Sequence, residues 1–262
     1  MSIREVLRQY ISGELSEEEA EKLLRLDFLE KIGNHTVFDH GREARRGIPE
    51  IIFGESKSPA MVAEIVARAI DDREIVLVSR ASEEHFKLIR EIIKGPTVIY
   101  NENARLITVK KKELVSHKGK IGILAAGSSD ITVAEEAKCV AQAMGVKVFT
   151  AYDVGVAGLH RILEPLKMMI KESVDAIIVV AGMEGALPSV VSGLTDVPVI
   201  GVPTSVGYGY GGRGEAALIS MLQSCSPGLA VVNIDNGVGA GAFAALIARK
   251  CHNRSNDKAH SL

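Results

Sequence analysis

The chain contains the stretch Lys120-Ile121-Gly122-Ile123-Leu124-Ala125-Ala126-Gly127-Ser128-Ser129-Asp130, followed at once by a helical run from Val133 to Met144. It predicts a buried strand, a tight Gly-Ser-Ser-Asp turn and a helix whose first backbone N–H groups are free. Free N–H groups and the positive end of the helix dipole favour a bound anion, and the serine hydroxyls add donors. The same residues are also typical of an ordinary helix start capped by Ser129 or Asp130. The turn is therefore a candidate phosphate site whose assignment depends on the rest of the chain.

The same pattern of strand and helix repeats along the second half of the chain. Apolar runs predict strands at Ile121–Ala126, Val146–Tyr152, Ala176–Ala181, Val197–Val202 and Leu229–Ile234. Amphipathic stretches predict helices at about 133–145, 157–171, 185–193, 213–223 and 238–250. Short apolar strands that alternate with helices indicate a parallel sheet covered on both faces. We therefore expect an α/β fold, with a flavodoxin-like or Rossmann-like three-layer domain whose ligands bind where strand order reverses.

Residues 1–115 predict a small N-terminal α/β domain, separated from a second domain at 120–251 by a charged connection around Lys110–Gly119. An arginine-rich segment, Phe38–Glu50, lies within it. This segment is typical of a solvated loop with internal ion pairs. Alternatively, Arg42, Arg45 and Arg46 converge on a phosphate or carboxylate. The last residues, 252–262, form a polar tail that we expect to be disordered.

Composition narrows the class of protein. The chain has 262 residues, 47% of them hydrophobic, and a net charge of −2, which suggests neither nucleic acid nor an anionic membrane as a partner. No apolar run reaches the roughly 18 residues of a membrane span, and the first 15 residues lack a secretory pattern, so a cytoplasmic location is expected. The three cysteines, an odd number without Cys-x-x-Cys spacing, indicate neither a disulfide framework nor a zinc cluster.

The loops that follow the predicted strands combine glycines with a few polar groups, as a site built from backbone amides requires. They read Gly127–Asp130, Asp153–Arg161, Ala181–Pro188, Gly201–Gly212 and Asp235–Gly241. Neither a Gly-x-x-x-x-Gly-Lys loop nor a Gly-x-Gly-x-x-Gly turn follows the first strand of this domain. The usual nucleotide motifs are therefore absent from these loops.

Several of these loops, in order, resemble the phosphoribosyl-aminoimidazole carboxylase (PurE-like) family. The matching segments are Gly-Ser-Ser-Asp at 127–130, Ala-Gly-Leu-His-Arg at 157–161, Ala-Gly-Met-Glu-Gly-Ala-Leu-Pro at 181–188, Val-Ile-Gly-Val-Pro at 199–203 and Asn-Gly-Val-Gly-Ala at 236–240. The chain is still more similar to a paralogous family, the pyridinium-3,5-biscarboxylic acid mononucleotide (LarB) synthases of nickel-pincer cofactor synthesis. That closer resemblance rests on Asp39-x-x-Arg42, Phe53-Gly54-Glu55, the Pro203–Gly209 run and Ser224-Cys225.

The differences between this chain and the phosphoribosyl-aminoimidazole carboxylases point to a different substrate ring. That family has Ala-Ala-His before Leu-Pro, where this chain has Glu184-Gly185-Ala186, and it lacks a cysteine near position 225. The resemblance to the LarB synthases implies carboxylation of the pyridinium ring of nicotinate adenine dinucleotide and hydrolysis of its phosphoanhydride, with release of AMP. The co-substrate would be carbon dioxide or bicarbonate. The resemblance also implies a homo-oligomer, an octamer being expected.

An electron-poor pyridinium ring must accept a nucleophile before one of its carbons can attack carbon dioxide. A thiolate serves for both addition and departure, so we assign a transient ring adduct to Cys225 and removal of the ring proton to Glu184. Cys139 is interpreted as core packing and Cys251 as incidental. Substrate binding is assigned to Gly127, Ser128, Ser129, Asp130, His160, Arg161, Met183, Gly185, Ala186, Ser205 and Asn236.

Magnesium is expected for the hydrolytic step, although its ligands are unknown from the sequence. Two other functions stay open at this point. One is an aminoimidazole ribonucleotide carboxylase or mutase, against which Cys225 and the missing histidine argue. The other is a nucleotide-binding module without catalysis.

Overall fold

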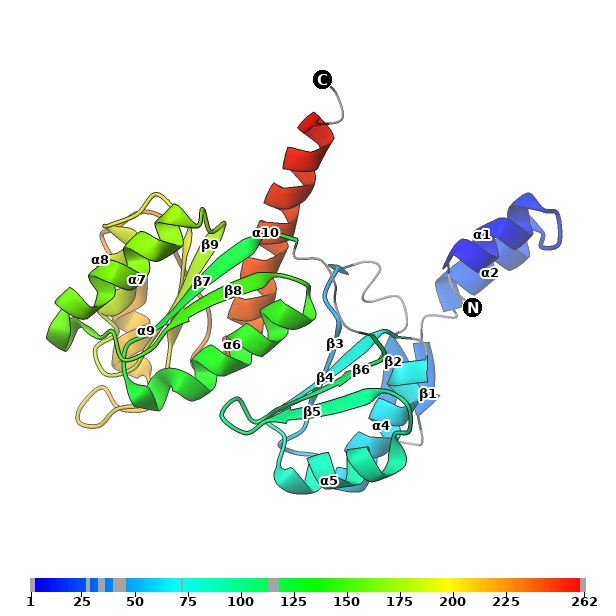
Figure 1. Cartoon of the computed structure of the whole chain (residues 1–262). Coiled ribbons are helices and arrows are strands. Elements are labelled where there is room, and N and C mark those ends of the chain that lie inside the picture. The colour runs from blue at the N-terminus through cyan, green and yellow to red at the C-terminus, as the bar shows by residue number, and fades with distance from the viewer. Residues whose placement is uncertain are drawn as a thin grey trace.

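A computed structural model describes residues 3–26, 29–32, 36–39, 46–71, 73–112 and 118–259 (Figure 1). Its larger unit is built on a five-stranded parallel sheet. The strands are β7 (Lys120–Ala125), β8 (Lys147–Ala151), β9 (Ala176–Ala181), β10 (Val199–Pro203) and β11 (Leu229–Val231). Their order in the sheet is β11-β10-β9-β7-β8, and each neighbouring pair is parallel. This is the flavodoxin-like order, with the reversal between β7 and β9, so the predicted fold class is confirmed.

Helices cover both faces of this sheet and enclose a separate core on each side. They are α6 (Ile131–Ala143), α7 (His160–Lys171), α8 (Leu187–Ser192), α9 (Glu215–Leu222) and α10 (Gly237–Ala259), with single 3-10 turns η1 (Ser128–Asp130) and η2 (Val156–Gly158). Alternate residues of β7 face opposite layers: Ile121 and Ile123 pack with α6 and α10, whereas Leu124 packs with α7 and α8. This alternation explains why the whole of β7 reads as a continuous apolar run.

The N-terminal unit is a mixed sheet with helices on one face. After α1 (Ile3–Ile11) and α2 (Glu17–Leu26), an antiparallel hairpin pairs β1 (Leu29–Ile32) with β2 (Thr36–Asp39). The main sheet has the order β3-β4-β6-β5, from β3 (Glu50–Phe53), β4 (Ile75–Ser79), β5 (Thr97–Asn101) and β6 (Leu106–Lys110). Helices α4 (Pro59–Asp71) and α5 (Glu83–Ile92) form a core with one face of that sheet. The hairpin was not predicted, because its strands are short and mix charged with apolar residues.

The two units share a hydrophobic core. Leu77 of β4 and Leu106 of β6 are fully buried and belong to the same cluster as Val140 of α6. A hydrogen bond of 2.7 Å from Arg249 Nη1 to the carbonyl oxygen of Gly47 adds a second link. The N-terminal sheet is therefore sandwiched between its own helices and α6 of the larger unit.

Two expectations about polar segments had different outcomes. Helix α10 continues to Ala259, so the prediction that it ends near residue 250 and leaves a disordered tail from Asn253 is wrong. The buried, alanine-rich first half anchors the helix, and no Gly or Pro follows Gly241 to stop its propagation. Of the three arginines proposed to bind an anion, Arg46 is exposed, whereas Arg42 and Arg45 lie outside the described residues. Within the described part of the chain, no helix is both long and apolar enough to cross a membrane.

Candidate active site

The turn after β7 directs its carboxylate inward and its hydroxyls outward. Asp130 is only 4% exposed, and its Oδ2 accepts a hydrogen bond of 2.9 Å from the Gly127 N–H. Its Oδ1 accepts one of 2.7 Å from the Thr204 hydroxyl, at the end of β10. Burial raises the pKa of the Asp130 carboxyl, against the effect of these two hydrogen bonds. Ser128 and Ser129 are exposed, so the turn presents two hydroxyls to a ligand while Asp130 ties it to β10.

We expect Thr204→Val to loosen this tie. Thr204 is fully buried, and the variant removes the donor to a buried carboxylate at nearly constant volume, a change that costs about 1–3 kcal/mol of unfolding free energy. Urea denaturation of the variant beside Thr204→Ser, which keeps the hydroxyl, measures the loss. Equal stability of the valine and serine variants would show that the hydrogen bond contributes nothing.

The loop after β8 carries a partly buried arginine with an unused donor. Arg161 Nη1 lies 2.6 Å from Oδ2 of Asp153, and a Cβ on Gly158 would lie 2.7 Å from Arg161 Nε. The Nε atom is buried, and within the described structure it has no hydrogen-bond partner. His160 is exposed at the first position of α7. A buried guanidinium N–H without an acceptor is suited to receive an anionic oxygen.

The loops after β9 and β10 pack directly on each other. The Met183 N–H donates to the Val206 carbonyl at 3.0 Å, and a Cβ on Gly182 would collide with that carbonyl. Gly185 has φ +63°, and a Cβ there would lie 2.7 Å from the backbone of Ala217 in α9. Glu184, between these two glycines, is exposed. The glycines therefore hold the loop against its neighbours and leave the Glu184 carboxylate free to reach a ligand.

The loop after β11 lies at the same carboxyl edge of the sheet as the loops described above. Asp235 has φ +55° and accepts a hydrogen bond of 2.8 Å from the Ser205 N–H, which joins this loop to the one after β10. Asn236 caps the start of α10, because its Oδ1 accepts from the Gly239 N–H at 2.8 Å. Short polar contacts thus connect the loops after β7, β9 and β11 to the loop after β10 at the carboxyl edge of the sheet. With one exception, the predicted site residues all lie on this edge.

The exception is Cys225. Its assigned role in the ring adduct requires it beside Glu184, at the carboxyl edge of the sheet. It is exposed in the connection from α9 to β11, on the amino-terminal side of β11. Its neighbour Ser224 accepts a hydrogen bond of 2.8 Å from the hydroxyl of Ser189 in α8. Within one chain, the structure therefore does not bring Cys225 together with Glu184. The connection between α9 and β11 has little local pattern, so its direction was not evident from the sequence.

The other two cysteines differ in their surroundings. Cys251 is exposed on α10. Cys139 is half-buried against the core, and burial raises the pKa of its thiol to about 11. A thiol with so high a pKa is a poor nucleophile at neutral pH, which supports the interpretation of Cys139 as a packing residue.

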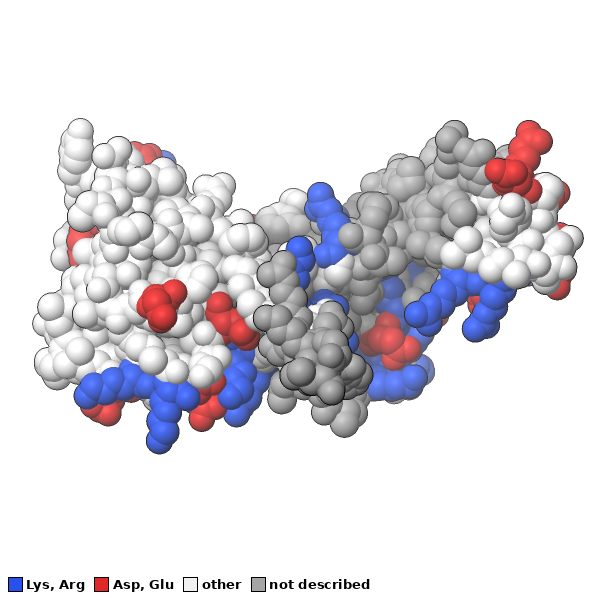
Figure 2. Space-filling view, turned by 90° about the horizontal axis from the view of Figure 1, so that it is seen from above, with Lys and Arg blue, Asp and Glu red and all other residues white. Residues whose placement is uncertain are grey.

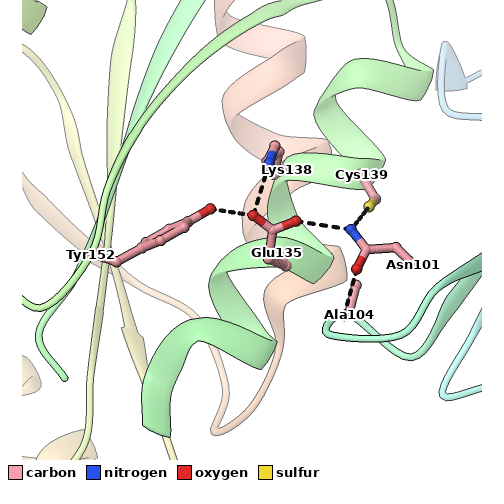
Figure 3. Close-up of polar contacts among 6 residues, drawn as sticks. All are labelled: Asn101, Ala104, Glu135, Lys138, Cys139 and Tyr152. Atoms are coloured by element: carbon pink, nitrogen blue, oxygen red, sulfur yellow. Dashed lines mark hydrogen bonds and ion pairs between the residues drawn. The ribbon is translucent and has the colours of Figure 1, made fainter. Parts of the chain in front are cut away.

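A polar network that the sequence did not predict surrounds Cys139 and spans both units (Figure 3). Glu135 of α6 accepts hydrogen bonds from Asn101 of β5 at 2.8 Å, from Lys138 at 2.8 Å and from the hydroxyl of Tyr152. Burial opposes ionisation of Glu135, but these three hydrogen bonds together hold its pKa below the usual value. Because Tyr152 directly follows β8, the network fixes the start of the Asp153–Arg161 loop to the N-terminal sheet.

A cleft lies between the two units and borders the carboxyl edge of the larger sheet. This interdomain cleft has a volume of about 440 Å³. Its lining comprises Ile48, Ile51, Phe53, Ser79, Arg80, Glu136, Asn233, Ile234, Asp235, Asn236, Val238, Gly239 and Ala242. Glu136 is 6% exposed and accepts a hydrogen bond of 3.2 Å from the Val238 N–H at the start of α10. Burial raises the pKa of Glu136 to about 7, against the opposing effect of Arg80 and with a smaller upward contribution from Asp235.

We expect Glu136 to make stability fall as pH rises. A folded-state pKa of about 7 lies above the ordinary 4.5, so the folded protein binds the proton more tightly than the unfolded chain. The contribution is therefore fully present below about pH 4.5 and is lost as pH rises through about 7, by roughly 3 kcal/mol in total. Glu136→Gln, which keeps an acceptor for Val238, should lose this dependence and be more stable than the wild type at about pH 8. Urea unfolding at about pH 5 and pH 8 tests this, and identical pH profiles of the two proteins would contradict it.

Metal-binding residues do not converge in the described part of the chain. It contains no group of three or more His, Cys, Asp or Glu side chains that could hold a metal ion. The carboxylate oxygens of Asp130 are both occupied by protein donors, as is Oδ1 of Asp235. The described residues therefore do not form a protein cage for magnesium.

The fold and the loops at its carboxyl edge define a flavodoxin-like domain with two exposed serine hydroxyls at the point where strand order reverses. Comparison with known proteins identifies the family to which the chain belongs. Residues 120–261 match the AIR carboxylase family, and residues 29–112 match the LarB/PurE-like N-terminal domain. The chain belongs to the LarB family, which is related to the PurE-like AIR carboxylases.

Relatives of two kinds are found. "Uncharacterized protein MJ0165" of Methanocaldococcus jannaschii is 45% identical over 256 residues, which cover 96% of this chain and 98% of that protein. The "Probable N5-carboxyaminoimidazole ribonucleotide mutase" of Methanothermobacter thermautotrophicus is 35% identical over 135 residues, or 50% of this chain and 38% of that protein. The mutase of the same name from Thermotoga maritima is 30% identical over 135 residues, or 49% of this chain and 74% of that protein. The similarity supports an enzyme of the carboxylase and mutase group.

Proposed function

We propose that this protein carboxylates the pyridinium ring of nicotinate adenine dinucleotide and hydrolyses its phosphoanhydride. The products are AMP and pyridinium-3,5-biscarboxylic acid mononucleotide, a precursor for nickel-pincer cofactor synthesis. The observation that carries the proposal is an exposed carboxylate, Glu184, on the same edge of the sheet as the exposed hydroxyls of Ser128 and Ser129, in a chain that has the LarB-type N-terminal domain.

In this proposal, the phosphate of the mononucleotide half lies over the turn after β7. Its donors are backbone N–H groups, the hydroxyls of Ser128 and Ser129, and the unused Nε–H of Arg161. His160 contacts the same substrate at the start of α7, and Met183, Gly185 and Ala186 form the wall beside the ring. Ser205 and Asn236 extend the contacts along the edge, and a substrate contact for Asp130 stays a prediction beside its structural tie to Thr204.

The chemistry begins with addition of the Cys225 thiolate to the ring carbon opposite nitrogen. The ring becomes an enamine, whose neighbouring carbon attacks carbon dioxide, supplied as such or from bicarbonate. Glu184 then removes the proton from that carbon, and expulsion of the thiolate restores aromaticity. Magnesium is proposed as a requirement of the hydrolysis, brought in with the substrate phosphates, because it is commonly bound by phosphates with few protein ligands.

In one chain, Cys225 lies on the amino-terminal side of β11 and Glu184 lies at the carboxyl edge of the sheet, so one chain alone does not bring the two together. We propose that a second copy supplies Cys225 to the edge that carries Glu184. Exposed apolar side chains support such packing: Ile219 and Leu222 of α9, next to Cys225, are 61% and 64% exposed. The face in Figure 2 shows mainly uncharged residues over the larger unit, which suits contact between copies. An octamer is the expected assembly.

The test is a direct assay of the purified protein with nicotinate adenine dinucleotide, bicarbonate and magnesium, followed by mass spectrometry of small molecules. AMP and a doubly carboxylated mononucleotide are the expected products. Aminoimidazole ribonucleotide and its N5-carboxy form are assayed in parallel, because the names of two relatives favour a mutase as the second candidate. Turnover of aminoimidazole ribonucleotide alone would move the protein to that activity, and binding of dinucleotide without any turnover would indicate a nucleotide-binding module.

A further inference from the structure

The interdomain cleft is not used by the chemistry described above, yet it adjoins the site. Asp235 and Asn236 belong to both: they line the cleft, and Asp235 also holds the Ser205 N–H at the carboxyl edge. A ligand longer than a mononucleotide can therefore extend from the strand edge into the cleft. The outer wall comes from the N-terminal unit, through Phe53 and Arg80.

The polar groups of the cleft favour a ligand with hydroxyl and amine donors. Its inner wall contains four acceptor side chains, Glu136, Asp235, Asn233 and Asn236, and one oxygen of each already accepts a hydrogen bond from a backbone N–H. Each has further acceptor capacity for a ligand. Two carboxyl groups there would repel a bare phosphate held deep in the cleft, but they accept hydrogen bonds from ribose hydroxyls or an exocyclic amine. A nucleoside therefore fits the inner wall better than an inorganic anion does.

The mouth of the cleft, unlike its inner wall, carries a positively charged side chain, Arg80. The Arg80 guanidinium lies 5.6 Å from the Phe53 ring and 3.0 Å from Glu55, and its side chain is 38% exposed. This arrangement holds a planar, permanently charged fork at the mouth of the cleft, where one face of the guanidinium is supported by an aromatic ring. Such a group is suited to a phosphate that enters with the nucleoside. The volume of about 440 Å³ is within the range of small-molecule sites.

We propose that the interdomain cleft is a nucleotide subsite that binds the AMP half of the dinucleotide, with the nucleoside against the inner wall and the phosphate at Arg80. This inference rests on the proposed function, since it concerns the half of the substrate that leaves. It gives the N-terminal unit a role in substrate binding: the phosphoanhydride would span the boundary between the Gly127–Asp130 turn and Arg80.

The test uses AMP itself as the probe, titrated calorimetrically into the full-length protein and two matched variants. Arg80→Gln removes the charge at the cleft. Arg90→Gln is the control, because Arg90 also lies over a phenylalanine of the N-terminal unit, 6.0 Å from the Phe86 ring, but does not line the cleft. We expect Arg80→Gln to weaken AMP binding about tenfold or more and Arg90→Gln to leave it unchanged. Nicotinate mononucleotide should bind all three proteins alike.

Photolabelling of the wild type with 8-azido-AMP gives a readout that does not depend on the variants' folding. A label on peptides that contain cleft residues, such as Phe53, Glu136 or Asn233, supports the subsite, and a label confined to peptides without cleft residues overturns it. Equal AMP affinity of the three proteins, or no AMP binding by the wild type, also overturns it. Turnover of the dinucleotide is measured separately, so absence of product refutes the proposed function, whereas unchanged AMP binding in Arg80→Gln refutes only the subsite.

Discussion

Cys225→Ser is expected to abolish formation of both products, with a loss on the order of 10⁴-fold or more, because serine cannot form and release the ring adduct that we assign to Cys225. Serine is nearly isosteric, but its hydroxyl is not ionised near neutral pH and adds poorly to the ring. Cys225 is exposed, so the substitution should leave the thermal midpoint almost unchanged. The measurement is product formation by mass spectrometry, together with the intact protein mass, which should show a dinucleotide adduct only when Cys225 is present.

Cys251→Ser is the matched control, since Cys251 is also exposed in this chain. It should retain full turnover and the adduct. If Cys225→Ser turned over substrate at the wild-type rate, the covalent route would be wrong, even if the overall reaction were correct.

Mixed oligomers of Cys225→Ser and Glu184→Gln are expected to regain activity that neither variant has alone. Glu184→Gln removes the base and should itself lower turnover by about 10²–10⁴-fold. If each site takes Cys225 from one copy and Glu184 from another, random mixing of equal amounts leaves both residues intact in about one quarter of the sites. Co-expressed and co-purified subunits should therefore show roughly a quarter of wild-type activity.

The control for this experiment is mixing of the separately purified variants without subunit exchange, which should stay inactive. A co-expressed mixture that is as inactive as its components would contradict the shared site. It would then require Cys225 and Glu184 to meet within one chain through a rearrangement of the α9–β11 connection.

Local sequence patterns predicted most of the larger unit because each of its elements is specified by short-range rules. The apolar runs of β7 and β9 are buried on both faces, and the Gly127–Asp130 turn follows β7 as expected. The carboxyl-edge location of Glu184 and Arg161 also followed from the sequence, since the loops after parallel strands share one edge.

Contacts between distant segments could not be predicted in this way. The tie from Asp130 to Thr204 joins residues 74 positions apart, and the network around Glu135 joins α6 to β5 and β8. Neither has a local signature, because each depends on how separate elements pack. The same is true of the interdomain cleft, whose walls come from β3, β4, α6 and the start of α10.

The sequence by itself determined the fold class, the family resemblance and the edge of the sheet that carries most of the candidate site residues, since strand periodicity and glycine-rich turns act over a few residues. Only the tertiary structure decided that Asp130 faces inward, that Arg80 and Glu136 meet across a cleft, and that Cys225 lies away from Glu184. The physical reason is that burial and side-chain pairing depend on the packing of whole layers, which brings together or separates residues far apart in the chain.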